Sequence, residues 1–411
     1  MSEPASHPAS HPASMAPEST AALAGIVRDA AAAGRALALR GGGSRHGLGH
    51  PVEGEVLALA GLSGISLYEP GALTLVAKAG TPLAEIEHTL ASESQLLPFE
   101  PLDLASLYGS GAASTLGGVV ATNASGPRRI QSGACRDSLI GVEFVDGAGR
   151  VVKNGGRVMK NVTGYDLVKL MCGTHGTLGA LTDVSFKLLP APEHAATLTL
   201  EELPVDRAIA AMSAALGSPF NVSGAAHLPA GEGGRPGGRP CTLVRIEGLL
   251  RSVDYRAEAL VKVLAPFGTA RIDDDPDSVA ATWRALRDVQ GFAAEADETR
   301  CVWRVSVKPT DGARVAERLP GAELQFDWGG GLVWVRSAVE LDVRAALGDI
   351  GGHATLMRAP PAVLERLGAF APEPAPLVAL SRRLRERFDP AGILNPGRLG
   401  EIEPRPAAAR A

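Results

Sequence analysis

Apolar positions in the first half of the chain alternate between helical spacing and short, strand-length runs. Residues from Leu23 to Ala30 recur at helical spacing, behind a cap at Ser19 or Thr20 and before a stop at Gly34. Short apolar runs of the kind that form strands lie at 36–40, 56–60, 65–68, 73–79, 139–145, 150–153 and 180–189. This mixture predicts an α+β unit.

Turn signals place further elements in the same half. Thr81-Pro82 has the cap-plus-proline pattern of a helix start, and residues 165–171 also have helical spacing. Asp146-Gly147-Ala148-Gly149 lies between two apolar runs and predicts a β-hairpin. Pro190 and Pro192 mark the end of the unit.

A second pattern of alternating helices and strands begins near residue 195 and predicts a second α+β domain. All four tryptophans fall in this part, where they suit core or interface anchors better than catalysis. Its one flexible loop is expected at 231–240, and an arginine-rich amphipathic helix at 377–388. The expected helices are 205–216, 252–264 and 278–289, and the expected strands are 241–247, 301–308 and 331–336.

Composition and charge narrow the class of protein. The chain has 411 residues, of which 45% are hydrophobic and 21% charged, so it is long enough for two or three globular domains. Its formal net charge is −5, without the basic excess that binding to nucleic acid requires. We therefore expect no nucleic-acid partner.

The four cysteines are far apart and form no CxxC pair, which argues against a disulfide framework, a zinc site or an iron–sulfur cluster. No apolar run has the length of a membrane span, and the N-terminus lacks a signal-peptide pattern. We expect reduced thiols, no transmembrane segment, and a cytoplasmic protein that can be membrane-associated through partners.

Glycine clusters carry the strongest chemical signal. A predicted strand ends in Arg40-Gly41-Gly42-Gly43-Ser44, where successive backbone N–H groups can bind an anion such as a diphosphate. A structural glycine loop explains this motif equally well when it is taken alone. The loop is neither a Walker A motif nor a Rossmann fingerprint, because His46 stands where the latter needs glycine. Clusters of small residues recur at 110–127 and 173–179.

Several motifs together resemble a known family: RGGGS, TLGGVVATNASGP, GACRDSLIG, MKNVTGYDLVKLMCGTHGTLGALTDVSFKLLP and the terminal FDPAGILNPGR. In this order they resemble FAD flavoproteins of the vanillyl-alcohol-oxidase/p-cresol-methylhydroxylase (PCMH) type, and within that superfamily the FAD-binding subunits of glycolate oxidase. The motifs cover most of 36–190 and 388–398.

The resemblance implies an α+β fold with a two-subdomain, PCMH-type FAD-binding domain, an α+β cap domain, and a C-terminal segment that returns to the flavin. With the patterns above, it gives a disordered tail at 1–18, the FAD-binding domain at 19–192, the cap at 193–360, where substrate or a partner would bind, and a C-terminal helix with its flavin-side segment at 361–411.

The resemblance also implies the cofactor and its contacts. FAD would be bound non-covalently, because Ser44 stands where relatives that attach it covalently have histidine, and His46 is expected to be a loop residue. The residues implied to contact FAD are Gly41, Gly42, Gly43, Ser44, Thr115, Gly117, Gly118, Thr122, Asn123, Gly176, Leu178, Gly179 and Asn395.

Two functions remain open at this point. The first is the FAD-binding subunit of a glycolate oxidase complex, an FAD-dependent oxidoreductase that converts small 2-hydroxy acids such as glycolate into 2-oxo acids. In this case electrons pass from the flavin to an iron–sulfur partner, and Arg245 or Arg304 is a candidate for binding the substrate carboxylate, although ion pairing is the more ordinary role for each.

The second is an FAD-holding electron-transfer or assembly subunit, whose related FAD-binding partner carries the substrate site. The sequence beyond 195 lacks the paired histidines and acid with which relatives bind a metal at the substrate. His227 and His353 stand alone and suit structural roles, so no metal site and no catalytic residue is assigned.

Overall fold

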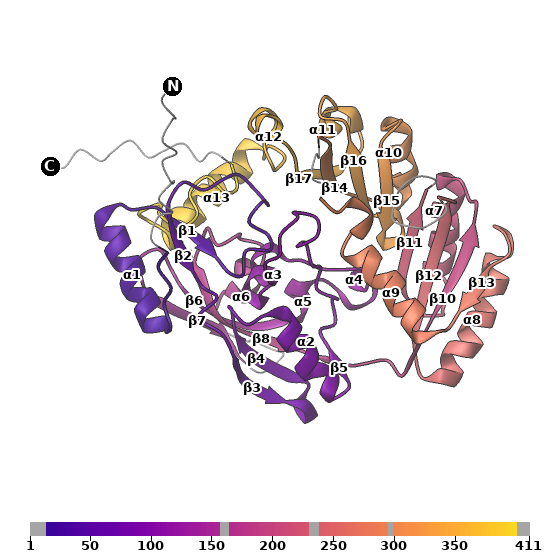
Figure 1. The fold of residues 1–411 in the computed structure, drawn as a ribbon, viewed down its shortest axis with the longest axis horizontal. Coiled ribbons are helices and arrows are strands. Elements are labelled where there is room, and N and C mark those ends of the chain that lie inside the picture. The colour runs from indigo at the N-terminus through magenta and orange to yellow at the C-terminus, as the bar shows by residue number, and fades with distance from the viewer. Residues whose placement is uncertain (1–13, 157–163, 230–237, 295–298, 401–411) are drawn as a thin grey trace, which may run out of the picture.

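The structure is a computed structural model that describes residues 14–156, 164–229, 238–294 and 299–400. Its strands form two large sheets on either side of the molecule (Figure 1). The N-terminal sheet has the order β3-β4-β8-β6-β7 and is antiparallel throughout. The second sheet has eight strands, in the order β13-β10-β12-β11-β15-β16-β14-β17. The α+β fold class is confirmed.

The first helix shows how local sequence signals set its ends. α1 spans Thr20–Ala33, the Ser19 hydroxyl accepts a hydrogen bond from the Ala22 N–H, and Gly34 closes the helix in the left-handed conformation. Its apolar side packs on the short parallel pair β1 (Leu37–Arg40) and β2 (Glu55–Ala58). The N-terminal sheet consists of β3 (Ile65–Glu69), β4 (Thr74–Lys78), β6 (Leu139–Val145), β7 (Val151–Gly155) and β8 (Ala180–Lys187).

Short helices cover this sheet. They are α2 (Leu83–Ser92), α3 (Leu116–Thr122), α5 (Cys135–Ser138) and α6 (Leu167–Met171). The short helix α4 (Arg129–Ser132) instead lies against β11 (Val222–Leu228) of the second sheet (Figure 1). The start of α2 differs from the prediction, since Pro82 rather than Thr81 is the capping residue. The Thr81 hydroxyl instead bonds with the backbone of Gly64 and Lys78, which lie in neighbouring turns. β5 (Gln95–Leu96) and β9 (Leu189–Pro190) form a separate, two-stranded antiparallel sheet.

The second sheet and its helices span 194–358, and we call this part the cap. The predicted boundary at residue 192 falls between β9 and β10. Its strands are β10 (His194–Glu201), β11 (Val222–Leu228), β12 (Cys241–Gly248), β13 (Arg271–Asp273), β14 (Cys301–Val307), β15 (Glu323–Asp327), β16 (Leu332–Ser337) and β17 (Gly352–Arg358). Its helices are α7 (Val205–Leu216), α8 (Leu250–Leu264), α9 (Pro276–Arg287), α10 (Gly312–Arg318) and α11 (Val343–Leu347).

The cap sheet is buried on both faces. One face packs on α7, α8 and α10, while α9 covers part of the other. The remaining area of that second face shares a hydrophobic core with the N-terminal part, in which Trp328 and Trp334 pack with Val119 and Val120. All four tryptophans are buried, so they are core residues of the chain and no exposed anchor for a partner.

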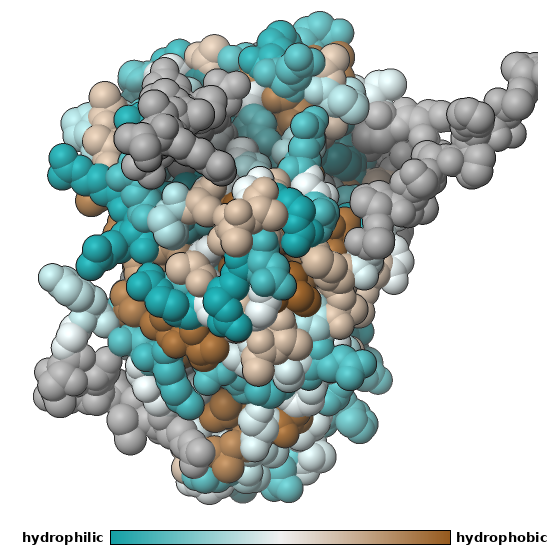
Figure 2. Space-filling view, turned by 90° about the vertical axis from the view of Figure 1, so that its left-hand side faces the viewer, coloured by the Kyte–Doolittle hydropathy of each residue, from teal (hydrophilic) through white to brown (hydrophobic). Residues whose placement is uncertain are grey.

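The C-terminal segment returns from the cap to the N-terminal part. α12 (Pro361–Leu367) packs against the cap core, and α13 (Ala375–Phe388), yellow in Figure 1, lies near β1 and β2. Leu394 then pairs in parallel with Leu37 of β1. The face on this side carries mainly hydrophilic groups with apolar ones between them (Figure 2). No helix within the described ranges is both long and apolar enough to cross a membrane.

The predicted N-terminal tail and the predicted flexible loop at 231–240 compare differently with the structure. The expected tail at 1–18 is too long, because the Met15 N–H donates to Val56 O (3.0 Å) and Met15 O accepts from Ala58 N (2.8 Å) at the edge of β2. An unpaired strand edge offers such hydrogen bonds to any extended neighbour. Residues 1–13 and most of the predicted flexible loop at 231–240 lie outside the described residues.

Candidate functional site

A cavity of about 1040 Å³ lies where four segments distant in sequence meet. Its walls are mainly the loop after β1, the start of α3, residues 174–176, and the C-terminal segment, which contributes α12 and residues 395–398. A volume of this size is at the upper end for small-molecule pockets, which indicates a large ligand.

Eleven of the thirteen residues predicted to contact the cofactor line this cavity: Gly41, Gly42, Gly43, Ser44, Thr115, Gly117, Gly118, Thr122, Gly176, Gly179 and Asn395. The other two do not. Asn123 ends α3 in a left-handed conformation, and its side-chain oxygen accepts from the Arg136 N–H. The Leu178 side chain packs in the hydrophobic core of the N-terminal part.

The glycine loop after β1 is shaped by close packing of backbone on backbone. A Cβ atom on Gly42 would lie 1.9 Å from the carbonyl oxygen of Ala113, and Gly43 has φ +98°, a conformation that favours glycine. Glycine at 42 is therefore required by the protein itself, in addition to any ligand. The loop leaves its backbone at the cavity wall, with Ser44 buried beside it.

The start of α3 forms the opposite wall. Thr115 caps the helix, with its hydroxyl accepting from the Gly118 N–H at 3.4 Å. A helix N-terminus carries partial positive charge and unpaired N–H groups, which favour an anion. Gly118 differs from Gly42, because the atoms nearest to its Cβ position are the Thr115 hydroxyl at 3.3 Å and an Arg45 nitrogen at 3.8 Å. A side chain at Gly118 would therefore meet the Thr115 and Arg45 side chains and no backbone atom, with the Thr115 hydroxyl having to move by a few tenths of an ångström.

Arg45 is the functional candidate that sequence reasoning missed. Its guanidinium, buried in the cavity wall, donates to the Ser114 hydroxyl (2.6 Å), the Ser44 hydroxyl (3.3 Å) and Leu102 O. Its Nε has no partner within the described part of the chain, and burial lowers the pKa of the group. Asp103 and Asp288 attract this cation, but no described carboxylate forms an ion pair with it, and a buried cation without an ion pair favours an anionic ligand. The sequence feature that could have identified Arg45 is its position directly after the RGGGS motif.

Asn395 joins the C-terminal segment to the cavity. Its side-chain oxygen accepts from Leu39 N (2.8 Å), and its amide nitrogen donates to His175 O (2.7 Å). The same side chain thus fixes β1 and the loop before β8. His175 and Arg398 also line the cavity, and burial, helped by the Arg398 charge, lowers the pKa of His175 to about 4. The imidazole is therefore neutral at pH 7.

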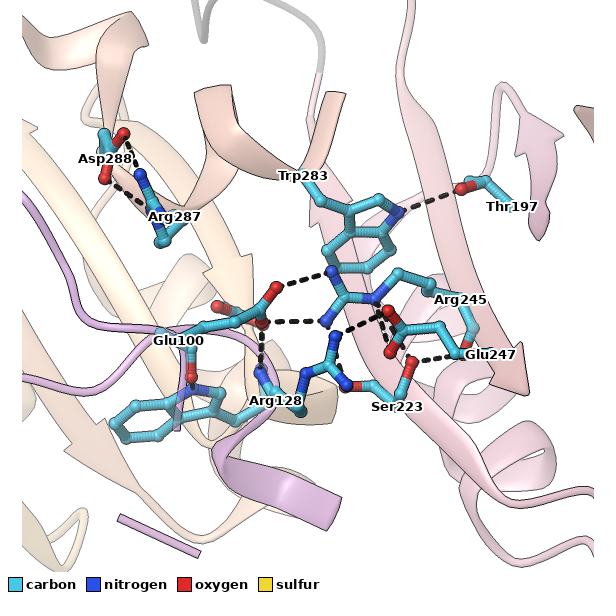
Figure 3. A network of polar contacts seen from close by, with 12 residues as sticks. Glu100, Arg128, Thr197, Ser223, Arg245, Glu247, Trp283, Arg287 and Asp288 are labelled. Carbon is cyan, nitrogen blue, oxygen red and sulfur yellow. Dashed lines mark hydrogen bonds and ion pairs between the residues drawn. The ribbon is translucent and has the colours of Figure 1, made fainter. Parts of the chain in front are cut away.

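Arg245, one of the two predicted carboxylate ligands, is engaged elsewhere (Figure 3). Its Nη1 and Nη2 donate to the two carboxylate oxygens of Glu100, each at 2.8 Å, and its guanidinium lies over the ring of Trp283. Arg128 in turn donates to Glu247 at 2.7 Å. These four residues, the junction ion-pair cluster, link the N-terminal part to β12 by two crossed pairs.

The two cap histidines considered in the sequence, His227 and His353, differ in burial. His227 is buried in β11 and its Nδ1 lies 3.0 Å from the Thr242 hydroxyl, whereas His353 is exposed near the start of β17. In the described ranges no group of three or more His, Cys, Asp or Glu side chains could hold a metal ion. The four cysteines are all buried and carry free thiols.

Comparison with known proteins identifies the family of the chain. A family described as "FAD binding domain" matches residues 12–155. The glycolate oxidase subunit GlcE of Escherichia coli (strain K12) is 36% identical over 88% of this chain and 92% of its own length. The glycolate oxidase subunit GlcD of Bacillus subtilis (strain 168) is 33% identical, over 36% of this chain and 29% of its own length.

A solved structure of alkyldihydroxyacetonephosphate synthase has a similar fold, with a TM-score of 0.67. It covers 93% of this chain and 76% of its own, at 16% sequence identity. This likeness supports the predicted fold, a PCMH-type FAD-binding part followed by a cap.

Proposed function

Because the chain belongs to the GlcE family of glycolate oxidase subunits, FAD-binding oxidoreductases of the PCMH-type superfamily, we propose that it serves the oxidation of small 2-hydroxy acids such as glycolate. In this proposal it works as one subunit of a complex. A related FAD-binding subunit and an iron–sulfur subunit complete the complex, and electrons leave this chain through the latter.

FAD is the cofactor, and the cavity suits it. The observation that carries the proposal is the pairing of a glycine-walled cavity of about 1040 Å³ with the buried Arg45, whose Nε has no hydrogen-bond partner and which forms no ion pair among the described residues. Arg45, the loop after β1 and the start of α3 each favour an anion. The diphosphate of FAD would be that anion. When bound, FAD would accept a hydride and pass the electrons onward.

The protein's own residues would position and enclose the cofactor. Gly41 to Ser44 and Gly117 to Gly118 would contact it through backbone, and Asn395 would fix the wall that β1 and His175 form. We propose non-covalent binding, since position 44 is serine and the His46 Nδ1 lies 2.9 Å from Gly43 O within its own loop.

A second candidate function keeps FAD but assigns substrate turnover to the partner. The engagement of Arg245 by Glu100 favours it, because a bidentate ion pair leaves that guanidinium unsuited to a substrate carboxylate. In this case the chain holds FAD for electron transfer or assembly.

Anaerobic addition of glycolate to the purified FAD-loaded chain separates the two. Bleaching of the flavin absorbance supports turnover by this chain. Bleaching only after the related FAD-binding subunit is added supports the second function. Failure of the purified chain to bind FAD at all, or failure of any assembled complex to oxidise 2-hydroxy acids, would overturn the proposal as a whole.

A further inference from the structure

Two arginines from distant segments lie against the same buried indole. The guanidinium carbon of Arg129 is 4.5 Å from the ring centroid of Trp328, and that of Arg304 is 5.1 Å from it. Arg129 opens α4 in the N-terminal part, whereas Arg304 lies on β14 of the cap. With the exposed His353 on β17, we call this group the Trp328 cluster.

Strand alternation places the cap members on one face of the sheet. Arg304 pairs with Trp334 on β16 and with Thr355 on β17, and His353 lies two residues from Thr355. Trp334 belongs to the core shared with the N-terminal part, whereas the neighbouring Trp303 packs toward the cap helices. The side chains of Arg304 and His353 therefore face the N-terminal part.

Trp328 is held in place from both sides. Its indole N–H donates to Gly126 O at 3.0 Å, in the segment between α3, which lines the cavity, and α4. Its backbone has φ +53°, and the Asp327 carboxylate accepts from its N–H at 2.6 Å. Left-handed backbone at a bulky residue is costly and is concentrated at functional sites, which fits an indole fixed as a platform.

Neither guanidinium forms an ion pair with an acid in the described part of the chain, although Asp327 attracts Arg304 and Asp137 attracts Arg129 from beyond ion-pair distance. Among the described residues, no carboxylate forms an ion pair or hydrogen bond with Arg129, Arg304 or His353. Burial, followed by the charge of Arg129, lowers the pKa of Arg304 to about 10, and burial with both arginines lowers the pKa of His353. Two like charges held beside one ring repel each other, and an anion between them would relieve this.

Stacking on an indole uses the face of a guanidinium and leaves its N–H groups, which lie in the plane, able to donate. A carboxylate can accept two of them from each arginine. We propose that the Trp328 cluster binds the carboxylate of a small 2-hydroxy or 2-oxo acid, with Arg129 and Arg304 as its ligands. This rests on the proposed function, since it names where the acid would be held.

The test is a titration of the FAD-loaded full chain with oxalate, followed by isothermal calorimetry and by the flavin difference spectrum. Oxalate should bind, and Arg304→Met and Arg129→Met should each weaken it about tenfold or more, which is the loss expected for a charge-assisted hydrogen bond. Arg304→Lys should recover part of the affinity. Raised salt should weaken binding in the wild type.

Arg207→Met is the matched control, because Arg207 also lies over an aromatic ring, that of Phe267, on the helix-covered side of the cap. It should leave oxalate affinity unchanged. FAD content, read from the visible spectrum of each variant, shows whether the variant has folded with its cofactor.

Three outcomes of the oxalate titration would overturn the inference. These are no oxalate binding by the FAD-loaded wild type, unchanged affinity in both FAD-containing arginine variants, and equal affinity for oxalate and inorganic phosphate, which would mean an unselective anion site. The proposed function is judged separately. Loss of oxalate binding in the variants supports the cluster even if glycolate fails to bleach the flavin, and bleaching at wild-type KM in both variants refutes the cluster alone.

Discussion

Replacing Glu100 with glutamine should destabilise the junction between the N-terminal part and the cap. The Glu100 carboxylate accepts hydrogen bonds from both terminal nitrogens of Arg245 and from the backbone N–H of Arg128, each at 2.8 Å. Glutamine keeps the shape but removes the charge and turns an amide N–H₂ toward the guanidinium. Arg245 would then have only Glu247 as a charged partner, at 3.4 Å.

The expected magnitude follows from burial. The side chains of Arg245 and Glu100 are 4% and 19% exposed, so the pair lies in a low-dielectric junction. Removal of one partner from a buried pair costs about 3–5 kcal/mol, because the other charge stays buried without compensation. For a chain of 411 residues, that loss lowers Tm by roughly 4–6 °C if unfolding is a single transition.

Differential scanning calorimetry of the FAD-loaded chain measures this loss, with Glu55→Gln as the control. Glu55 pairs with Arg35 on the surface, with exposed fractions of 38% and 40%, so its loss should cost at most about 1 kcal/mol. The double variant Glu100→Gln/Arg245→Met should lose less than the sum of the single variants, because no buried charge is then left without its partner.

Low pH should also weaken the ion pair between Glu100 and Arg245. Burial alone would raise the pKa of Glu100, but the attraction of Arg245 and its hydrogen bonds outweighs burial and holds the pKa at about 2. The stability that this carboxylate contributes is therefore complete above its ordinary pKa of about 4.3 and is lost as the pH falls toward 2. Equal melting temperatures for Glu100→Gln and Glu55→Gln, or strictly additive losses in the double variant, would refute this reasoning.

Further predictions concern the cavity and one buried acid. Because Ser44 replaces the linking histidine, acid precipitation should release intact FAD, and flavin left on the polypeptide would contradict this. Gly118→Val should reduce FAD content while the melting temperature of the FAD-free protein stays near wild type, since a Cβ at this position meets only the side chains of Thr115 and Arg45 and no backbone; normal flavin stoichiometry would mean that no ligand approaches there. Arg45→Met should raise the FAD dissociation constant about tenfold or more by removing a charge-assisted hydrogen bond, as measured by fluorescence titration. Burial raises the pKa of Asp327 to about 7, so this group contributes stability at low pH that is lost as the pH rises from about 4 to 7. Asp327→Asn should remove that loss from denaturant melts, and an unchanged pH profile would argue against it.

Local signals in the sequence determined the elements whose ends depend on nearby residues. α1 begins after Ser19 and stops at Gly34 because cap and stop act on the backbone of adjacent turns. α7 and the hairpin of β6 and β7 also lie where spacing and turn residues predict them. The glycine motifs likewise marked most of the cavity wall, because each motif is one continuous segment.

The cap sheet was only partly predictable. Three strands were expected there, whereas the sheet has eight. β11 is buried along its whole length, so the alternation of apolar and polar residues that reveals a half-exposed strand is missing. Its hydrogen-bonding partners lie in separate segments, and pairing between such segments follows from the fold rather than from local spacing.

Tertiary structure alone decided which charged groups meet. Glu100 and Arg245 are 145 positions apart, and Asn395 is 220 positions from His175. In the sequence, Arg245 and Arg304 were equivalent candidates for a carboxylate. Folding placed Arg245 in an ion pair with Glu100 and placed Arg304 beside Arg129, where no acid of the described residues lies at ion-pair distance. Whether an arginine meets a partner or stays available to a ligand depends on burial and on distance through space, because charge interactions act across the packed interior and are independent of the order of residues along the chain.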